Sequence, residues 1–257
     1  MKDWNPELYL QFEAERTRPA RELLSRIVHQ QANYISDLGC GPGNSTELLH
    51  NAYPEARVTG VDSSQAMLEQ AKQRLPACQF QQADIGHWRP ENPQDIIYAN
   101  ASLQWVPNHN QLMLHLLRQL VPGGVLAFQV PDNLDQPSHA LMRKVASEGT
   151  WSAKYSQQRY HDKVLLTTEG YYDLLAEAGC QVDIWRTTFY HVMPSVAAIV
   201  EWVKSTGLRP FLAPLDETEQ QAFLQHYLAE LEKVYLLRSD GQVLLAFPRL
   251  FVVATKP

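Results

Sequence analysis

Apolar and polar residues alternate along the chain with two different periods, and the period changes near residue 34. Before that point, apolar residues at mixed helical spacing predict helical structure from Pro6 to about Val28. Proline lacks an amide donor and its ring clashes with the preceding turn. Pro19 is therefore expected to split this segment into two helices.

From Tyr34 onward, short apolar runs alternate with segments of helical periodicity. The runs predict five strands, at residues 34–38, 57–62, 79–84, 95–100 and 125–130. Helices are expected between them, starting over residues 45–50 and covering 64–75 and 109–120. Pro122-Gly123-Gly124 predicts a turn before the fifth strand. Strands that alternate with helices imply a parallel, doubly wound sheet covered on both faces.

The pattern loosens after Pro131. Two further strands are expected at residues 182–192 and 250–254, with helices at 167–178, 195–206 and 216–237. Gly179 is the expected stop of the first of these helices. We therefore expect one α/β domain with a mostly parallel seven-stranded sheet and a helical cap. Residues 30–130 would form its ligand-binding core, and residues 131–166 and 194–240 its cap or lid.

Composition narrows the class of protein. The 257 residues are 45% hydrophobic and 19% charged, with a net charge of −6, which fits a folded domain and not a disordered chain. No lysine or arginine run is present, so a nucleic-acid partner is not expected. Cys40, Cys78 and Cys180 are isolated, and no metal site is expected. The polar start and the lack of an apolar run of about 20 residues favour a cytoplasmic protein with no membrane partner.

Chemistry-bearing residues fall at the predicted strand ends, where open α/β sheets bind ligands. Gly39, Gly41 and Gly43 let the backbone after the first strand turn tightly and approach a ligand. Each feature alone has a purely structural explanation, such as a tight turn or a helix cap. The glycine loop followed by polar residues at three successive strand ends is harder to explain in that way. These polar residues are Asp62, Asp84 and Asn100. Asp62 would accept two ribose hydroxyls, and Asp84 an exocyclic adenine amine.

The spacing of the loop separates candidate ligands. A dinucleotide site requires Gly-x-Gly-x-x-Gly, but here Asn44 stands where the last glycine would be. Asp37, just before the loop, suits a cofactor with a free ammonium group. S-adenosylmethionine has that group and NAD does not. A nicotinamide-dependent oxidoreductase and a non-catalytic cofactor-binding module remain as alternatives at this point.

Several motifs appear in the order found in class I S-adenosylmethionine-dependent methyltransferases, which residues 30–130 resemble. They are Asp37-Leu38-Gly39-Cys40-Gly41-Pro42-Gly43, Gly60-Val61-Asp62, Ala83-Asp84, Ala99-Asn100-Ala101 and Val121-Pro122-Gly123-Gly124. Within that class, further segments along nearly the whole chain resemble the trans-aconitate 2-methyltransferase family. These are Asp3-Trp4-Asn5-Pro6, Ser102-Leu103-Gln104-Trp105, Asp183-Ile184-Trp185-Arg186-Thr187-Thr188, Thr206-Gly207-Leu208-Arg209-Pro210 and Leu245-Ala246-Phe247-Pro248-Arg249-Leu250-Phe251.

The resemblance implies a small polycarboxylate substrate, S-adenosylmethionine as cofactor and S-adenosylhomocysteine as product. Further cofactor contacts are then expected at Arg18, Ser63, Met67 and Ile85, although Met67 equally fits a core position.

A carboxylate is already ionised at pH 7, so its methylation requires no catalytic base. The other carboxylates of such a substrate need cationic anchors, and arginine suits them through paired donors. The candidate anchors are Arg16, Arg18, Arg186, Arg209 and Arg249. The aromatic residues expected to line the site are Tyr9, Trp105, Tyr190 and Trp202. Any one of these arginines also fits a solvated surface charge. Another small acceptor remains the alternative substrate, and the oligomeric state is left open.

Overall fold

The computed structural model of the chain describes residues 13–29, 31–155, 165–204 and 206–257. These residues belong to two compact units. The first unit comprises the chain up to Pro131, Lys163–Thr187 and Leu250–Pro257, and the second comprises Asp132–Asp162 and Thr188–Arg249.

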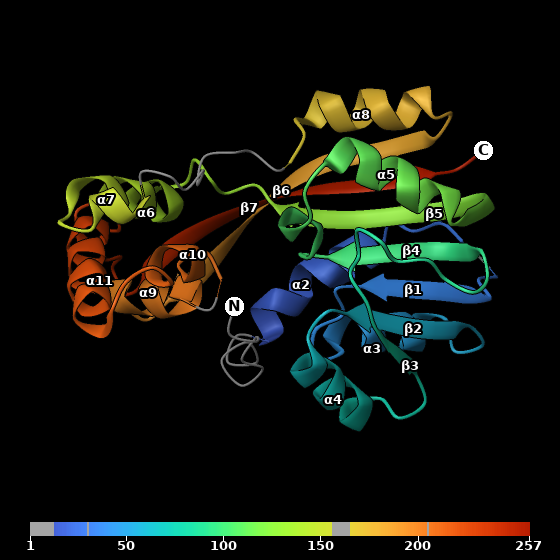
Figure 1. Ribbon diagram of the computed structural model, residues 1–257, viewed down its shortest axis with the longest axis horizontal. Coiled ribbons are helices and arrows are strands. Elements are labelled where there is room, and N and C mark those ends of the chain that lie inside the picture. The colour runs from blue at the N-terminus through green and yellow to red at the C-terminus, as the bar shows by residue number, and fades with distance from the viewer. Residues whose placement is uncertain (1–12, 30, 156–164, 205) are drawn as a thin grey trace. The chain divides into compact units, whose positions relative to one another are not determined.

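A seven-stranded sheet has the order β3-β2-β1-β4-β5-β7-β6 (Figure 1). Its strands are β1 (Tyr34–Leu38), β2 (Arg57–Asp62), β3 (Gln79–Gln82), β4 (Gln94–Asn100), β5 (Leu120–Pro131), β6 (Gln181–Met193) and β7 (Val243–Thr255). Neighbouring strands from β3 to β5 pair in parallel. Backbone hydrogen bonds join Lys256, just after β7, to Gly124 near the start of β5, and Pro248 of β7 to Asp132, just after the end of β5. β7 is therefore antiparallel to β5. The predicted α/β class with a mostly parallel sheet of seven strands is confirmed.

Helices of the first unit cover both faces of its part of the sheet. They are α2 (Glu13–Leu24), α3 (Asn44–Ala52), α4 (Gln65–Arg74), the short 3₁₀ helix η1 (Leu103–Trp105), α5 (His109–Arg118) and α8 (Thr168–Glu177). On β4, Ile97 and Ala99 belong to the apolar core that includes residues of α5 and α8. Tyr98 lies between them and donates to the Ala20 carbonyl of α2 at 2.6 Å. Since successive strand side chains point to opposite faces, α2 lies on the face opposite α5 and α8.

Pro19 does not split the N-terminal segment where it is described, so that expectation is wrong. α2 is a single helix from Glu13 to Leu24 with Pro19 inside it. Ala20 and Leu23 are fully buried, and the Tyr98 hydroxyl bonds to the helix backbone. The burial of this apolar side and the added hydrogen bond offset the backbone hydrogen bond that proline removes.

The turn predicted at Pro122-Gly123-Gly124 also differs from the structure. β5 already begins at Leu120, which pairs with Gln94, while Val125 pairs with Ile96. The extra residues between Leu120 and Val125 form a bulge in β5, with Gly123 at a φ of 76°. A bulge absorbs a Pro-Gly-Gly sequence without ending the strand, because only glycine adopts such a φ without strain.

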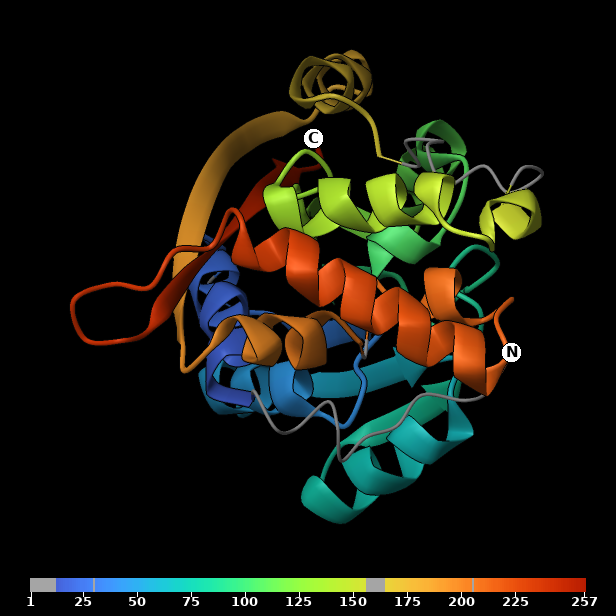
Figure 2. The ribbon, with the colours of Figure 1, turned by 90° about the vertical axis from the view of Figure 1, so that its left-hand side faces the viewer.

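The second unit contains five helices among its described residues, together with the adjoining ends of β6 and β7. They are α6 (Pro137–Glu148), α7 (Ser152–Tyr155), α9 (Val196–Lys204), α10 (Arg209–Leu212) and α11 (Glu217–Glu232). α6, in yellow-green, and α11, in orange-red, lie side by side (Figure 2). Inside the unit the Trp151 and Phe223 rings stand 5.3 Å apart. The two segments expected to form a cap are therefore helical over much of their described length.

Within the described chain, no helix combines the length and the apolar character that crossing a membrane requires.

Candidate functional site

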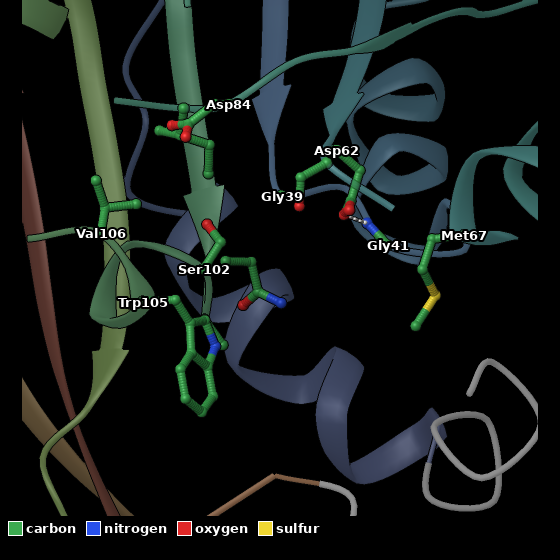
Figure 3. Close-up of a pocket in the computed structure, with 12 residues that line it drawn as sticks. Gly39, Gly41, Asp62, Met67, Asp84, Ser102, Trp105 and Val106 are labelled. Atoms are coloured by element: carbon green, nitrogen blue, oxygen red, sulfur yellow. Dashed lines mark hydrogen bonds between the residues drawn. The ribbon is translucent and has the colours of Figure 1, made fainter. Parts of the chain in front are cut away.

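A pocket of about 230 Å³ opens in the first unit where β1, β2 and β4 end (Figure 3). Its lining comes from the last residues of β2 and β4 and from the segments that follow β1, β2, β3 and β4, so parallel pairing is what brings the residues together. The lining residues are Gly39, Gly41, Asp62, Ser63, Met67, Asp84, Ile85, Asn100, Ala101, Ser102, Trp105 and Val106.

The glycine loop forms the wall nearest β1. The Gly39 and Cys40 amides both donate to the Val61 carbonyl of β2, at 2.7 and 3.0 Å. Gly39 has a φ of 73°, and a Cβ at this position would lie 2.2 Å from the Ser102 Cβ. Only glycine permits this backbone conformation and this approach to the chain after β4.

Asp62 ties the glycine loop to the end of β2. One carboxylate oxygen accepts the Gly41 amide and the other accepts the Ser64 amide, each at 2.9 Å. The Gly41 bond is drawn in Figure 3. Each oxygen of a carboxylate has a second lone pair, so Asp62 can accept ligand hydroxyls without giving up either amide.

Asp37 is a fully buried carboxylate directly before the loop. Its Oδ2 accepts the hydroxyls of Ser45 and Thr46, each at 2.7 Å, while its Oδ1 has no hydrogen-bond partner among the described residues. Burial raises the pKa of Asp37 from 3.8 to about 6, against the lowering effect of the two hydroxyls. A buried acceptor with a free lone pair is suited to a cationic group, because pairing would restore its charged form.

Asp84, Asn100 and Met67 line other parts of the pocket. The Asp84 Oδ1 accepts the Gly86 amide at 2.7 Å, and the Asp84 side chain is largely exposed. Asn100, the last residue of β4, accepts a 2.6 Å hydrogen bond from the fully buried Gln129. Met67 is buried on α4 and lines the pocket with its thioether, which is suited to packing against a flat ring.

The structure gathers most of the cofactor residues expected from the sequence around this pocket. Asp37 and Gly43 lie beside the lining and not in it, and Arg18 is an exposed residue of α2 outside it. Trp105 lines the pocket and is half exposed. Ala101, Ser102 and Val106 also line it and are not among the contacts predicted from the sequence. All three lie within six residues after the polar strand end Asn100, which is the signal that could have identified them.

The expected acceptor anchors are distributed over both units. Arg186, in the first unit, is exposed on β6 and donates to the Thr168 hydroxyl at 3.4 Å. Arg209, Arg249 and Tyr190 belong to the second unit. Arg249 is buried, with its guanidinium carbon 4.8 Å from the centre of the Phe247 ring, whereas Tyr190 is exposed. Trp202 is also buried there, in contact with His191. Tyr9 and the Arg16 side chain lie outside the described residues.

Comparison with known proteins agrees with this geometry. Residues 35–124 match the model of a methyltransferase domain. Two solved structures share the fold. A putative methyltransferase from Bacillus halodurans is 14% identical with a TM-score of 0.61, covering 93% of this chain and 99% of that one. Phosphoethanolamine N-methyltransferase 2 of Haemonchus contortus, solved with S-adenosyl-L-methionine, is 18% identical with a TM-score of 0.55, covering 93% and 52%.

The fold and the matched domain define a class I methyltransferase, as predicted. More specific matches come from curated proteins named trans-aconitate 2-methyltransferase. That of Yersinia pestis (strain Pestoides F) is 59% identical over 99% of this chain and 98% of its own. That of Shigella dysenteriae serotype 1 is 56% identical over 100% and 99%. The chain belongs to the trans-aconitate 2-methyltransferase family, and S-adenosylmethionine, the methyl donor of class I methyltransferases, is its cofactor.

The raised pKa of Asp37 gives the first testable prediction. If the ionised Asp37 is the partner of a ligand ammonium, affinity for S-adenosylhomocysteine should fall as pH drops through 6, because protonation then removes the negative charge. The loss should be about tenfold between pH 7.5 and pH 5. Calorimetry across this range measures it. Asp37→Asn should bind more weakly with no such pH dependence, and a flat wild-type profile would contradict the assignment.

Proposed function

We propose that the chain transfers the methyl group of S-adenosylmethionine to a carboxylate of trans-aconitate and forms a methyl ester. The observation that carries this proposal is 59% identity, over nearly the full length of both chains, to a relative named for that activity. The pocket at the strand ends supports the cofactor half of the reaction.

The residues around the pocket fit S-adenosylmethionine, which supplies an electrophilic sulfonium methyl group when bound. Asp62 would accept the ribose hydroxyls, and Asp84 the adenine amine. Met67 and Ile85 offer apolar surface for the adenine ring. The free oxygen of Asp37 would accept from the ammonium group.

The acceptor needs binding and orientation more than activation. A carboxylate carries its charge at pH 7, so no side chain has to remove a proton before the oxygen attacks. The rate then depends on holding that oxygen in line with the methyl group and on excluding water from it. We propose Arg186, Arg209 and Arg249 as partners of the acceptor carboxylates and the second unit as the part of the chain that selects the acceptor. Trp105 and Tyr190 would supply aromatic surface.

A transfer assay with methyl-labelled S-adenosylmethionine tests the function. Label should appear on trans-aconitate in preference to cis-aconitate, citrate and isocitrate, and mild base should release it, as expected for an ester. Base-stable label, or none on any of the four acids, would overturn the proposal. Calorimetry with NADH and S-adenosylhomocysteine addresses the oxidoreductase alternative, which binding of NADH alone would support.

Substitution of Arg209 or Arg249 by Met should raise KM for the acid while the Kd of S-adenosylhomocysteine stays unchanged. Loss of one charge-assisted contact is worth about 1.5–3 kcal/mol, so KM should rise about 10- to 100-fold. Arg26→Met is the control for loss of an arginine charge elsewhere, because Arg26 is an exposed arginine paired with Asp183 at 3.7 Å. Equal loss of affinity for acid and cofactor product in either variant would point to a folding defect instead.

A further inference from the structure

The chain after β4 is an unusual part of the pocket wall. Ala101 and Asn108, with φ of 55° and 58°, are the non-glycine residues with positive φ in the described chain. They flank the turn that contains η1 and carries Trp105 and Val106 into the pocket. Left-handed backbone is unfavourable for residues with a Cβ, so this turn must be held by contacts from its surroundings.

His109 supplies one of those contacts. Its Nε2 lies 2.9 Å from the Leu103 carbonyl oxygen, and its Nδ1 lies 2.6 Å from the Tyr171 hydroxyl. A carbonyl oxygen only accepts, so Nε2 carries the proton. Nδ1 is then the acceptor, and the Tyr171 hydroxyl donates to it. Burial lowers the pKa of His109, which favours this neutral form.

Tyr171 fixes the histidine from a separate element. It lies on α8 and is fully buried, as is Leu103, while His109 is 2% exposed. The Tyr171 ring meets Phe128 of β5 edge to face, with the centroids 5.3 Å apart. Neither Tyr171 nor His109 lines the pocket. The chain of contacts therefore runs from α8 through His109 to the first residue of η1, and it ends at Trp105, two residues further on.

Trp105 is the exposed end of this chain of contacts, with 49% of its surface exposed. In Figure 3 it stands with Ser102 and Val106 across the pocket from Asp62 and Met67. We propose that Tyr171 and His109 are positioning residues, which hold the Leu103–Val106 turn so that Trp105 closes its side of the ligand pocket. This inference rests on the proposed function, in which that pocket takes S-adenosylmethionine.

Tyr171→Phe tests the proposal, because it removes only the hydroxyl and keeps the ring contact with Phe128. The Kd of S-adenosylhomocysteine should rise about fivefold, the usual effect of losing one buried hydrogen bond. The decisive measurement is the same substitution in a Trp105→Ala background. If Tyr171 acts through the placement of Trp105, its effect on Kd should shrink to less than about twofold there. Effects that multiply in the double variant would overturn the proposal.

Two further variants separate positioning from general stability. Tyr227→Phe removes an equally buried hydroxyl, which donates to the Ser138 carbonyl at 2.7 Å in the second unit. It should lower Tm about as much as Tyr171→Phe and leave Kd unchanged. His109→Gln retains an N–H able to reach Leu103 and should bind S-adenosylhomocysteine more tightly than His109→Leu.

The outcomes also distinguish this inference from the function on which it rests. If the wild-type chain does not bind S-adenosylhomocysteine, the proposed function and the inference fail together. If the wild type binds and Tyr171→Phe binds equally well, only the inference fails.

Discussion

Asp62→Asn should weaken S-adenosylhomocysteine binding about a hundredfold, since an amide cannot accept at both ends and each lost charge-assisted bond costs about 1.5–3 kcal/mol. In the wild-type chain one oxygen holds the Gly41 amide and the other the Ser64 amide. The amide NH₂ of asparagine would face one of these donors. The glycine loop or the start of α4 would then shift, and a ribose acceptor would be lost as well. Calorimetry measures the change in Kd.

Asp95→Asn is a control that removes a carboxylate charge away from the pocket. The Asp95 Oδ2 accepts the amides of Asn33 and Tyr34, each at 2.8 Å, near the start of β1 and β4. Parallel strands place their starts at the edge of the sheet opposite the pocket. Asp95→Asn should therefore lower Tm with little change in Kd. Similar losses of affinity in both variants would show that Asp62 acts through fold stability alone.

Gly39→Ala should abolish measurable S-adenosylhomocysteine binding and lower stability by about 3 kcal/mol, from left-handed strain and steric overlap together. The added methyl group would lie 2.2 Å from the Ser102 Cβ. Ser102 is itself fixed, because its hydroxyl donates to the Leu38 carbonyl at 2.6 Å. Relief of the overlap would move the loop or the chain after β4, and both line the pocket. Thermal unfolding and calorimetry together measure the two effects.

Gly41→Ala separates the effect of left-handed backbone strain on stability from the effect of steric overlap. Gly41 has a φ of 54°, and a Cβ there would meet no described atom within 4 Å. Its stability loss should therefore be about 1–2 kcal/mol, the cost of left-handed backbone alone. If Gly39→Ala were no worse than Gly41→Ala in stability, the contact with Ser102 would not be the reason for glycine at position 39.

The cofactor half of the site was predictable because it depends on local sequence. In a parallel sheet all strand ends fall at one edge, so Asp62, Asp84 and Asn100 could be grouped from the strand pattern alone. The loop spacing then favoured S-adenosylmethionine over a dinucleotide. Asp37 could be predicted in the same way, but only the structure shows that its Oδ1 has no hydrogen-bond partner among the described residues.

Features that depend on distant parts of the chain were not predictable in this way. The helix around Pro19 persists because of contacts with β4, 78 residues away in the sequence from Ala20 to Tyr98. The bulge in β5 is set by its pairing with β4. The contact of Tyr171 with His109 spans 62 residues and has no local sequence signal. The ligand partners of the arginines proposed as acceptor anchors could not be predicted from local sequence either, because nothing near these arginines indicates which ligand they contact.

The place of β7 in the sheet affects how the chain can fold during synthesis. β7 lies between β5 and β6, yet it is the last strand in the sequence, at Val243–Thr255. On the ribosome, β5 and β6 therefore emerge before the strand that joins them. Until then β5 has one unpaired edge, and β6, whose neighbour in the sheet is β7, has two. Exposed strand edges promote aggregation. We expect nascent chains that stop before residue 243 to depend strongly on chaperones, and chains released beyond residue 255 to lose that dependence.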